Sequence, residues 1–301
     1  MIDFIKIHYR DKRDFESFVL MEGNFENVTG QFDTHTGEIG YPYKTKFETM
    51  DYVISKKTGC IKNSLHKFYN KVVLGQDQNF NDFTYSNLAF SISQLLKKMV
   101  NVSETRITHL EFGLNILVQI PAEEIIRKNI LMHNLEGFNH NRQYYGQGEL
   151  KQFDRYNYFI KIYDKAKQYR KEYKLKNNIL RVELKINKSR EFHKTGIFNL
   201  LDLLDKINLE KLFSLLLERF DELTIIDDVE NFNHFTDKDK IIFKEYVNPR
   251  YWENLLELKK YQTRHRNKIN FERIQSQYSL NQTKQELRAL LVEKFNYLIN
   301  N

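Results

Sequence analysis

Apolar and polar residues alternate with a period of two along much of the first two thirds of the chain. Apolar side chains recur at about every second position, with imperfect phase, in four stretches: residues 2–8, 104–118, 158–166 and 179–187. Successive side chains of a strand point to opposite faces, so each stretch predicts a strand with one aliphatic and one polar face. Turn-forming residues are frequent in residues 21–59, which predict short strands in hairpins, and residues 63–73 predict one more strand.

Helical periodicity appears in shorter stretches and then dominates the last third. From about Ser86 to Met99 the aliphatic residues fall on one helical face, and residues 121–135 predict a helix with Pro121 in its first turn. From residue 196 onward the pattern predicts only helices and loops. The sequence therefore predicts an α+β fold, with an antiparallel sheet covered by helices on one face in residues 1–205 and an all-helical region in residues 206–301.

Charge and composition narrow the class of protein. The chain has 47 Lys and Arg against 40 Asp and Glu, a net charge of +7, and 41% hydrophobic residues, so it can form a large core and attract an anionic partner. Its single cysteine, Cys60, excludes an internal disulfide and a cysteine-based zinc site. The N-terminal residues carry charge from position 3 onward and resemble no signal peptide, and no apolar run is long enough for a membrane span. These features predict a protein of the cytoplasm with no membrane partner.

Three predicted strands carry chemically active side chains on their polar faces. These side chains are His109, Glu111 and Asn115 in the first strand, Lys161, Tyr163 and Lys165 in the second, and Arg181, Glu183 and Lys185 in the third. If the strands share one sheet, its polar face gathers a phenol, two carboxylates, a histidine and several cations. A solvated sheet face also carries charges of both signs, so a purely structural role is the alternative.

This combination suits the cleavage of a phosphodiester. The carboxylates of Glu111 and Glu183 can hold a hard divalent ion such as Mg²⁺ or Mn²⁺, which polarises the phosphate. The hydroxyl of Tyr163 can attack phosphorus and form a covalent intermediate, while Lys165 and Arg181 stabilise the negative charge of the transition state. Because a phenolate leaves more readily than a sugar alkoxide, the same bond can later be exchanged again.

The order of the segments resembles a known family. The segments are SLHKFYN, SNLAFSISQLLKKM, ETRITHLEFGLNI, KIYDK, LRVELKI and FHKTGIFNLLDLL. In this order they resemble the rolling-circle replication initiators of filamentous phages, the gene II endonuclease class, and the related plasmid initiators of the Rep-trans-like type. The resemblance covers roughly residues 1–205 and is weaker after them.

The resemblance implies a metal-dependent, site-specific nickase. Such an enzyme cuts one strand at an origin, stays attached to the 5′ end through a tyrosine, and leaves a 3′-hydroxyl as primer. Tyr163 matches the family's nucleophile, Lys165 the lysine that follows it, and Glu183 the glutamate of the Arg-x-Glu strand. Glu111 takes the acidic position of the earlier strand, with His109 as a third ligand or an orienting group. The His109-Leu110-Glu111 sequence departs from the Arg-hydrophobic-Asp pattern of phage relatives, and no His-hydrophobic-His pair is present.

The implied partner is origin DNA, single- and double-stranded, in the cytoplasm of a bacterial host. A host helicase, a host polymerase and a second copy of the chain are further partners that this class allows. Residues 268–298 predict two helices with a break near Asn281, which form either a DNA-reading helix-turn-helix or a plain helical hairpin. Clustered tyrosines can stack on unpaired bases: Tyr144, Tyr145, Tyr156, Tyr158 and Tyr169. The cations expected to contact DNA are Lys161, Lys167, Arg170, Lys185, Lys284 and Arg288.

Two other classes of function stay open at this point. A DNA-binding protein without catalysis, such as a repressor or a decayed initiator, keeps the basic face and the C-terminal helices. A structural or interaction protein merely solvates the charged face of its sheet.

Overall fold

A computed structural model describes the chain except for residues 142–148 and 228–233. Within the described residues, ten strands form one antiparallel sheet in the order β2-β3-β4-β5-β1-β6-β11-β10-β9-β8. The strands are β1 (Ile2–Tyr9), β2 (Thr29–Phe32), β3 (Ile39–Phe47), β4 (Met50–Ile54), β5 (Gly59–Ser64), β6 (Thr105–Val118), β8 (His140–Asn141), β9 (Leu150–Asp154), β10 (Tyr158–Asp164) and β11 (Asn178–Ile186). The predicted antiparallel sheet is confirmed.

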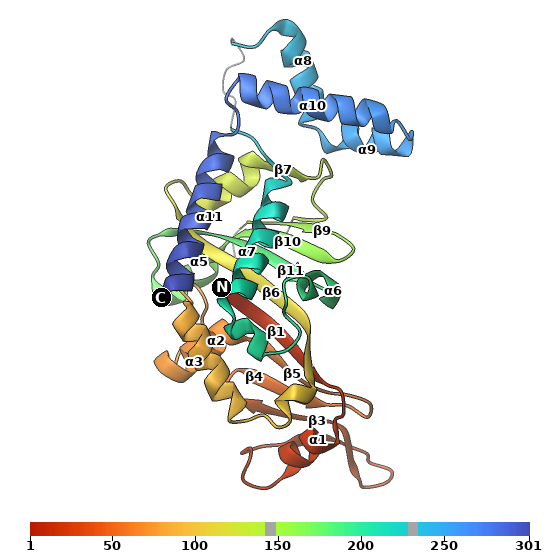
Figure 1. Cartoon of the computed structure of the whole chain (residues 1–301), viewed down its shortest axis with the longest axis vertical. Coiled ribbons are helices and arrows are strands. Elements are labelled where there is room, and N and C mark those ends of the chain that lie inside the picture. Colours follow the sequence, from red (N-terminus) through yellow and green to blue (C-terminus); the bar gives the residue numbers. More distant parts are fainter. Residues whose placement is uncertain (142–148, 228–233) are drawn as a thin grey trace.

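Helices cover the aliphatic face of this sheet. The helices of residues 1–227 are α1 (Arg13–Leu20), α2 (Leu65–Leu74), α3 (Tyr85–Leu96), α4 (Ala122–Glu124), α5 (Lys165–Tyr173), α6 (Ser189–His193), α7 (Lys206–Asp221) and the short η1 (Val102–Glu104), η2 (Ile125–Asn129) and η3 (Leu201–Leu204). Figure 1 shows α7 and the late helix α11 (Gln282–Asn300) lying across the sheet. The aliphatic residues of β6 and β11 pack against them in the main core, so the predicted coverage of one face by helices is also confirmed.

Two predicted elements are wrong in part. Residues 63–73 form mostly helix α2, because β5 ends at Ser64 and the Ser64 hydroxyl accepts a hydrogen bond from the backbone N–H of Lys67, which caps the new helix. Residues 121–135 begin as the short helical turns α4 and η2 but continue as strand β7 (Ile130–His133). β7 pairs with β12 (Leu223–Ile225), a short strand in a stretch for which helices and loops are predicted. The first error lies at a local helix cap, and the second lies where a strand partner distant in the sequence decides the local structure.

The helical C-terminal region is confirmed, and its helices join two different cores. Helices α8 (Asp237–Tyr246), α9 (Pro249–Glu257) and α10 (Tyr261–Gln277) pack around the buried Trp252 in a second hydrophobic cluster, the upper part of the molecule in Figure 1. Helices α7 and α11 instead belong to the main core, where Phe295 of α11 stacks on Phe213 of α7 with ring centres 4.1 Å apart. The expected division at residue 205 therefore does not coincide with the boundary between the two cores.

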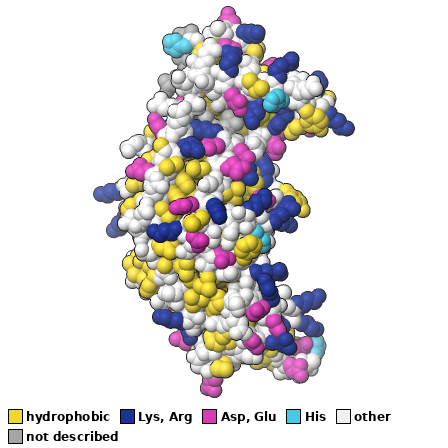
Figure 2. All heavy atoms as spheres, in the orientation of Figure 1, with side chains coloured by type: hydrophobic (Ala, Val, Ile, Leu, Met, Phe, Trp, Pro, Cys, Tyr) yellow, Lys and Arg dark blue, Asp and Glu magenta, His cyan; other side chains and the backbone are white. Residues whose placement is uncertain are grey.

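The surface of the helix-covered side mixes hydrophobic and charged side chains. Figure 2 shows Lys and Arg side chains gathered along the right-hand edge of this view and at the outer end of the α9–α10 pair. Among the described residues, no helix is both long enough and apolar enough to cross a membrane.

The packing of α11 leads to a prediction about stability. Phe295→Ala removes a buried ring that contacts both Phe213 and Phe112, and we expect it to lower the free energy of unfolding by about 3–5 kcal/mol. Urea denaturation followed by circular dichroism measures the change. Asn296→Ala, on the exposed side of the same helix, is the matched control. Equal stability of the two variants would show that α11 is not part of the main core.

Candidate active site

The register of three neighbouring strands brings the polar side chains together. β11 lies between β6 and β10. Glu183 of β11 is opposite Lys161 of β10, and Lys185 is opposite Glu111 of β6. Opposed side chains in an antiparallel pair lie on the same face of the sheet. The phenol, the two carboxylates and most of the cations that the sequence points to therefore share one face, the one opposite the main core.

Two lysines neutralise the two carboxylates. Lys161 Nζ lies 2.9 Å from Glu183 Oε1 and 3.6 Å from Glu111 Oε1, and Lys185 Nζ lies 3.1 Å from the same Glu111 oxygen. Burial and the charge of Glu183 raise the pKa of Glu111. Burial also disfavours the charge of Glu183, but Lys161 and Arg181 outweigh it and lower the pKa of Glu183 to about 2. Glu183 is thus the firmly ionised member of the pair.

The hydroxyl of Tyr163 points at this ionised carboxylate. It donates a hydrogen bond of 3.2 Å to Glu183 Oε2. Burial, and then the negative charge of Glu183, raise the pKa of Tyr163 well above its ordinary value. The phenol is therefore neutral in this arrangement, and its ionisation requires a base or an added cation beside it.

Lys165 supplies an unusual amine next to the phenol. It is the first residue of α5 rather than part of the strand, because β10 ends at Asp164, whose carboxylate accepts a backbone hydrogen bond and caps the helix. Lys165 is only 2% exposed, and its Nζ lies 5.5 Å from the ring centre of Tyr163 and 5.2 Å from that of Tyr169. Burial, together with the charge of Arg181, lowers the pKa of Lys165 to about 7.

Arg181 connects three strands of the site through hydrogen bonds of its guanidinium. Its guanidinium donates to Glu183 at 2.8 Å, to Asn115 at 2.9 Å and to Asp3 of β1 at 3.1 Å, and the residue is 2% exposed. Gly113 permits this path, because a Cβ at that position would lie 3.1 Å from Arg181 Nη2 and only 2.8 Å from a backbone oxygen of β11. Arg181 uses three of its five N–H donors inside the protein and is buried, so its shown role is to orient Glu183.

Sequence analysis missed the residues that anchor Arg181. Asp3 accepts hydrogen bonds from the Ser64 hydroxyl and from Asn79 Nδ2, the latter at 2.9 Å, and Asn79 Oδ1 accepts one from the Tyr169 hydroxyl at 2.7 Å. Burial opposes the charge of Asp3, but Arg181 outweighs it and lowers the pKa of this carboxyl. The available signal was the phase slip at Asp3, where an acidic residue interrupts an apolar start of strand.

The residues expected to hold a metal do not form a ready site. His109 Nδ1 lies 3.3 Å from the hydroxyl of its neighbour Thr108. Across the described part of the chain, no group of three or more His, Cys, Asp or Glu side chains is placed to hold a metal ion. Lys161 stands between Glu111 and Glu183, where a shared cation would bind. A divalent ion at these carboxylates therefore has to displace the Lys161 ammonium.

The other cations expected to contact DNA lie in two places. Lys167 forms an ion pair with Glu123 at 2.5 Å, and Arg170 is half-buried in the last turn of α5. In α11, Lys284 Nζ donates to the backbone oxygen of Asp221 at 2.6 Å, and Arg288 forms an ion pair with the Asp221 carboxylate at 2.9 Å. These last two residues fasten α11 to the end of α7.

The tyrosines expected to stack on bases differ in their surroundings. Tyr144 and Tyr145 lie outside the described residues. Tyr158 and Tyr169 donate hydrogen bonds within the protein. Tyr156 is 80% exposed, in the connection between β9 and β10, and is the most exposed of the three tyrosines of this group that the structure describes.

Comparison with known proteins finds a distant likeness to a solved structure. No family model matches the chain, and no curated protein matches it. Among solved structures, the chain is similar to that of the rolling circle replication initiator protein from Geobacillus stearothermophilus, with 12% sequence identity, a TM-score of 0.42, and coverage of 77% of this chain and 89% of that chain. At this distance we base the function on the geometry of this chain's own residues.

The position of Lys161 leads to a prediction about metal binding. Lys161→Met removes the ammonium between Glu111 and Glu183, and we expect the affinity for Mn²⁺ to rise by roughly tenfold or more, since two buried carboxylates then lack a shared cation. Electron paramagnetic resonance of free Mn²⁺ measures the affinity. Lys167→Met, which breaks an ion pair outside the site, is the control. An unchanged affinity in Lys161→Met would contradict the idea that this lysine occupies the cation position.

Proposed function

We propose that this protein initiates rolling-circle replication by nicking one DNA strand at an origin through Tyr163. The observation that carries the proposal is the hydrogen bond from the Tyr163 hydroxyl to the buried, ionised Glu183, on a sheet face supplied with Lys161, Lys165 and Lys185. A tyrosine held by an acid and surrounded by cations suits attack on a phosphodiester. The segment order described above supports the same class. Its setting would be the cytoplasm of a bacterial cell, where a host polymerase extends the new 3′ end.

The proposed reaction is a transesterification. Tyr163 Oη attacks phosphorus, the Oη–P bond forms and the P–O3′ bond breaks. The phenolic proton passes to the neutral amine of Lys165, and the departing O3′ takes up a proton from water to become the 3′-hydroxyl primer. The DNA keeps a 5′-phosphotyrosyl link, and the reverse reaction rejoins the strand with no external energy source.

The remaining residues position groups and balance charge. Arg181 and Asp3 hold Glu183 so that it orients the Tyr163 hydroxyl. Lys161 and Lys185, which already face the carboxylates, can turn toward a phosphate that enters the site. The Mg²⁺ or Mn²⁺ implied by the family resemblance would polarise the phosphate once it had displaced Lys161 from the space between Glu111 and Glu183.

A second candidate is DNA binding without catalysis. The observation in its favour is that both carboxylates are already neutralised by lysines, while the pKa of Tyr163 is raised. A repressor or a decayed initiator would show salt-sensitive DNA binding and no covalent adduct with any divalent ion.

The nucleophile is tested by transfer of label from DNA to protein. We expect wild-type protein, incubated with supercoiled origin DNA and Mn²⁺, to yield a nicked circle and a tyrosyl–DNA adduct, and Tyr163→Phe to lower both by at least about 1,000-fold, the scale of losing a nucleophile. Tyr261→Phe, at an exposed tyrosine of α10 outside the site, is the control. Full nicking by Tyr163→Phe would remove the assigned nucleophile.

The role of Lys165 is tested by the pH dependence of single-turnover nicking. The pKa of Lys165 is lowered to about 7, so its amine is protonated below this pH and free to accept a proton above it. The rate is therefore expected to rise with pH and level off above about 7. Lys165→Arg keeps a charge that does not titrate in this range, and its profile should be lower and flat. A wild-type profile without this rise would exclude Lys165 as the base.

A further inference from the structure

Two rows of side chains that are rich in Lys and Arg cross the same sheet face beside the candidate active site. The strand register places Lys46, Asp51, Lys62, Lys6 and His109 opposite one another from β3 to β6. The adjacent row, by the same pairings, contains Lys44, Val53, Cys60, His8 and Arg106. We name their five Lys and Arg members the basic track: Lys6, Lys44, Lys46, Lys62 and Arg106.

The basic track leads directly to the site. His109 ends the first row on β6, two residues before Glu111, and Lys185 faces Glu111 from β11. Tyr163 follows on the next strand. The track is therefore continuous with the candidate active site, on one surface and without a change of face.

Four of the five cations of the track form no ion pair with the residues that the structure describes. Asp51 is the one acid in the two rows, and Lys46 neutralises it at 3.6 Å. Among the ion pairs of the described residues, none involves Lys6, Lys44, Lys62 or Arg106. The neighbouring histidines respond to this field: burial, followed by the charges of Lys6 and Arg106, lowers the pKa of His8 to about 4. A surface of this kind favours a polyanion.

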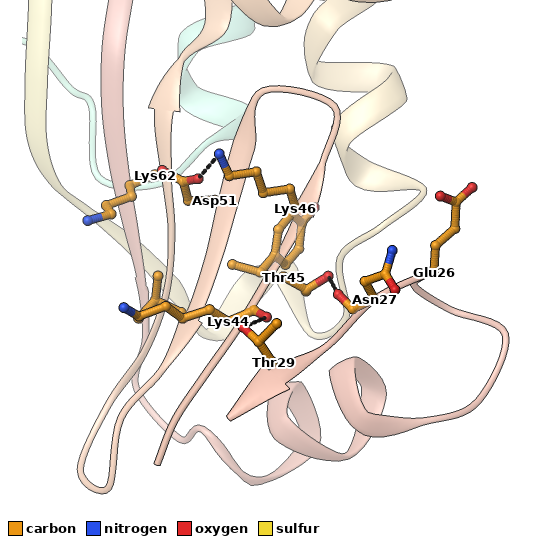
Figure 3. Close-up of a pocket in the computed structure, with 10 residues that line it drawn as sticks. Glu26, Asn27, Thr29, Lys44, Thr45, Lys46, Asp51 and Lys62 are labelled. Atoms are coloured by element: carbon orange, nitrogen blue, oxygen red, sulfur yellow. Dashed lines mark hydrogen bonds and ion pairs between the residues drawn. The ribbon is translucent and has the colours of Figure 1, made fainter. Parts of the chain in front are cut away.

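At its far end, the track opens into a hollow of about 620 Å³. Lys44, Lys46 and Lys62 line it, together with Thr29 of β2 and Glu26, which precedes that strand. Figure 3 shows the side chains of Lys44 and Lys62 extending to the same side, while Lys46 reaches back to Asp51. Two free ammonium groups thus point together at the end of the track.

We propose that the basic track holds the sugar–phosphate backbone of a single DNA strand whose scissile phosphate lies at Tyr163. Neighbouring strands are about 4.8 Å apart, so the four spacings from β6 to β3 span about 19 Å, which accommodates a short run of nucleotides. A row of cations across a sheet face follows one extended backbone. This inference rests on the proposed nicking function, because cleavage requires one strand to lie beside the tyrosine.

Binding of a labelled oligonucleotide tests the track. A 20-nucleotide single strand of the origin is titrated by fluorescence anisotropy with protein carrying Tyr163→Phe, so that no cleavage interferes. Adding Lys6→Ala, Lys44→Ala and Lys62→Ala should raise Kd by roughly tenfold or more and reduce the slope of log K against log salt by about 2, since each phosphate contact on a single strand contributes about 0.7.

The matched control removes three lysines from the helices on the opposite side. Lys71→Ala in α2, Lys97→Ala at the residue that follows α3, and Lys211→Ala in α7, all at exposed positions, should leave Kd within about twofold. Unchanged thermal unfolding of both triple variants shows that they are folded. A track variant that binds the single strand as the control variant does would overturn the proposal. So would a track variant that loses duplex binding while it keeps single-strand binding.

The outcome is separate from that of the nicking experiment. If track substitutions weaken binding but wild-type protein forms no tyrosyl adduct, the track stands as a DNA-binding surface and the proposed nuclease fails. If wild-type protein forms the adduct and the track substitutions change neither Kd nor salt slope, the nuclease stands and the track is wrong.

Discussion

A single buried guanidinium links three strands of this protein. Arg181 joins its own strand β11 to Asn115 of β6 and to Asp3 of β1, while it also fixes Glu183. Taking such a charge out of water costs several kcal/mol in a folded protein and is tolerated only when hydrogen bonds and counter-charges surround it. Here two carboxylates and an amide do so. The position of the Tyr163 hydroxyl depends on this arrangement, because the carboxylate that receives its hydrogen bond is itself held by Arg181.

In the proposed nuclease, the same charges would keep Tyr163 un-ionised until DNA binds. Each acid has a lysine beside it, and the phenol faces a negative group that discourages its ionisation. A phosphodiester that enters would compete for these lysines and leave the carboxylates less shielded. Substrate binding and activation of the site would then be a single electrostatic event.

Much of the sheet could be predicted from the sequence, because period-two alternation reports directly which side chains share a face. That signal placed Glu111, Lys161, Tyr163 and Glu183 on one surface, and the register of β6, β11 and β10 brings them into contact. It could not reveal Asp3, whose importance arises from a partner 178 positions away. It also could not separate strand from helix in residues 63–73, where apolar residues fit both periods and the Ser64 cap decides.

The placement of α11 has a consequence for biosynthesis. The aliphatic face of β1 and β6 is complete early in translation, yet one of the helices that cover it is encoded after residue 281. The nascent chain therefore leaves part of this apolar surface uncovered while residues 119–300 are made, and chaperones bind such surfaces. A product truncated before α11 would carry every side chain of the candidate site and still lack a helix that covers its main core.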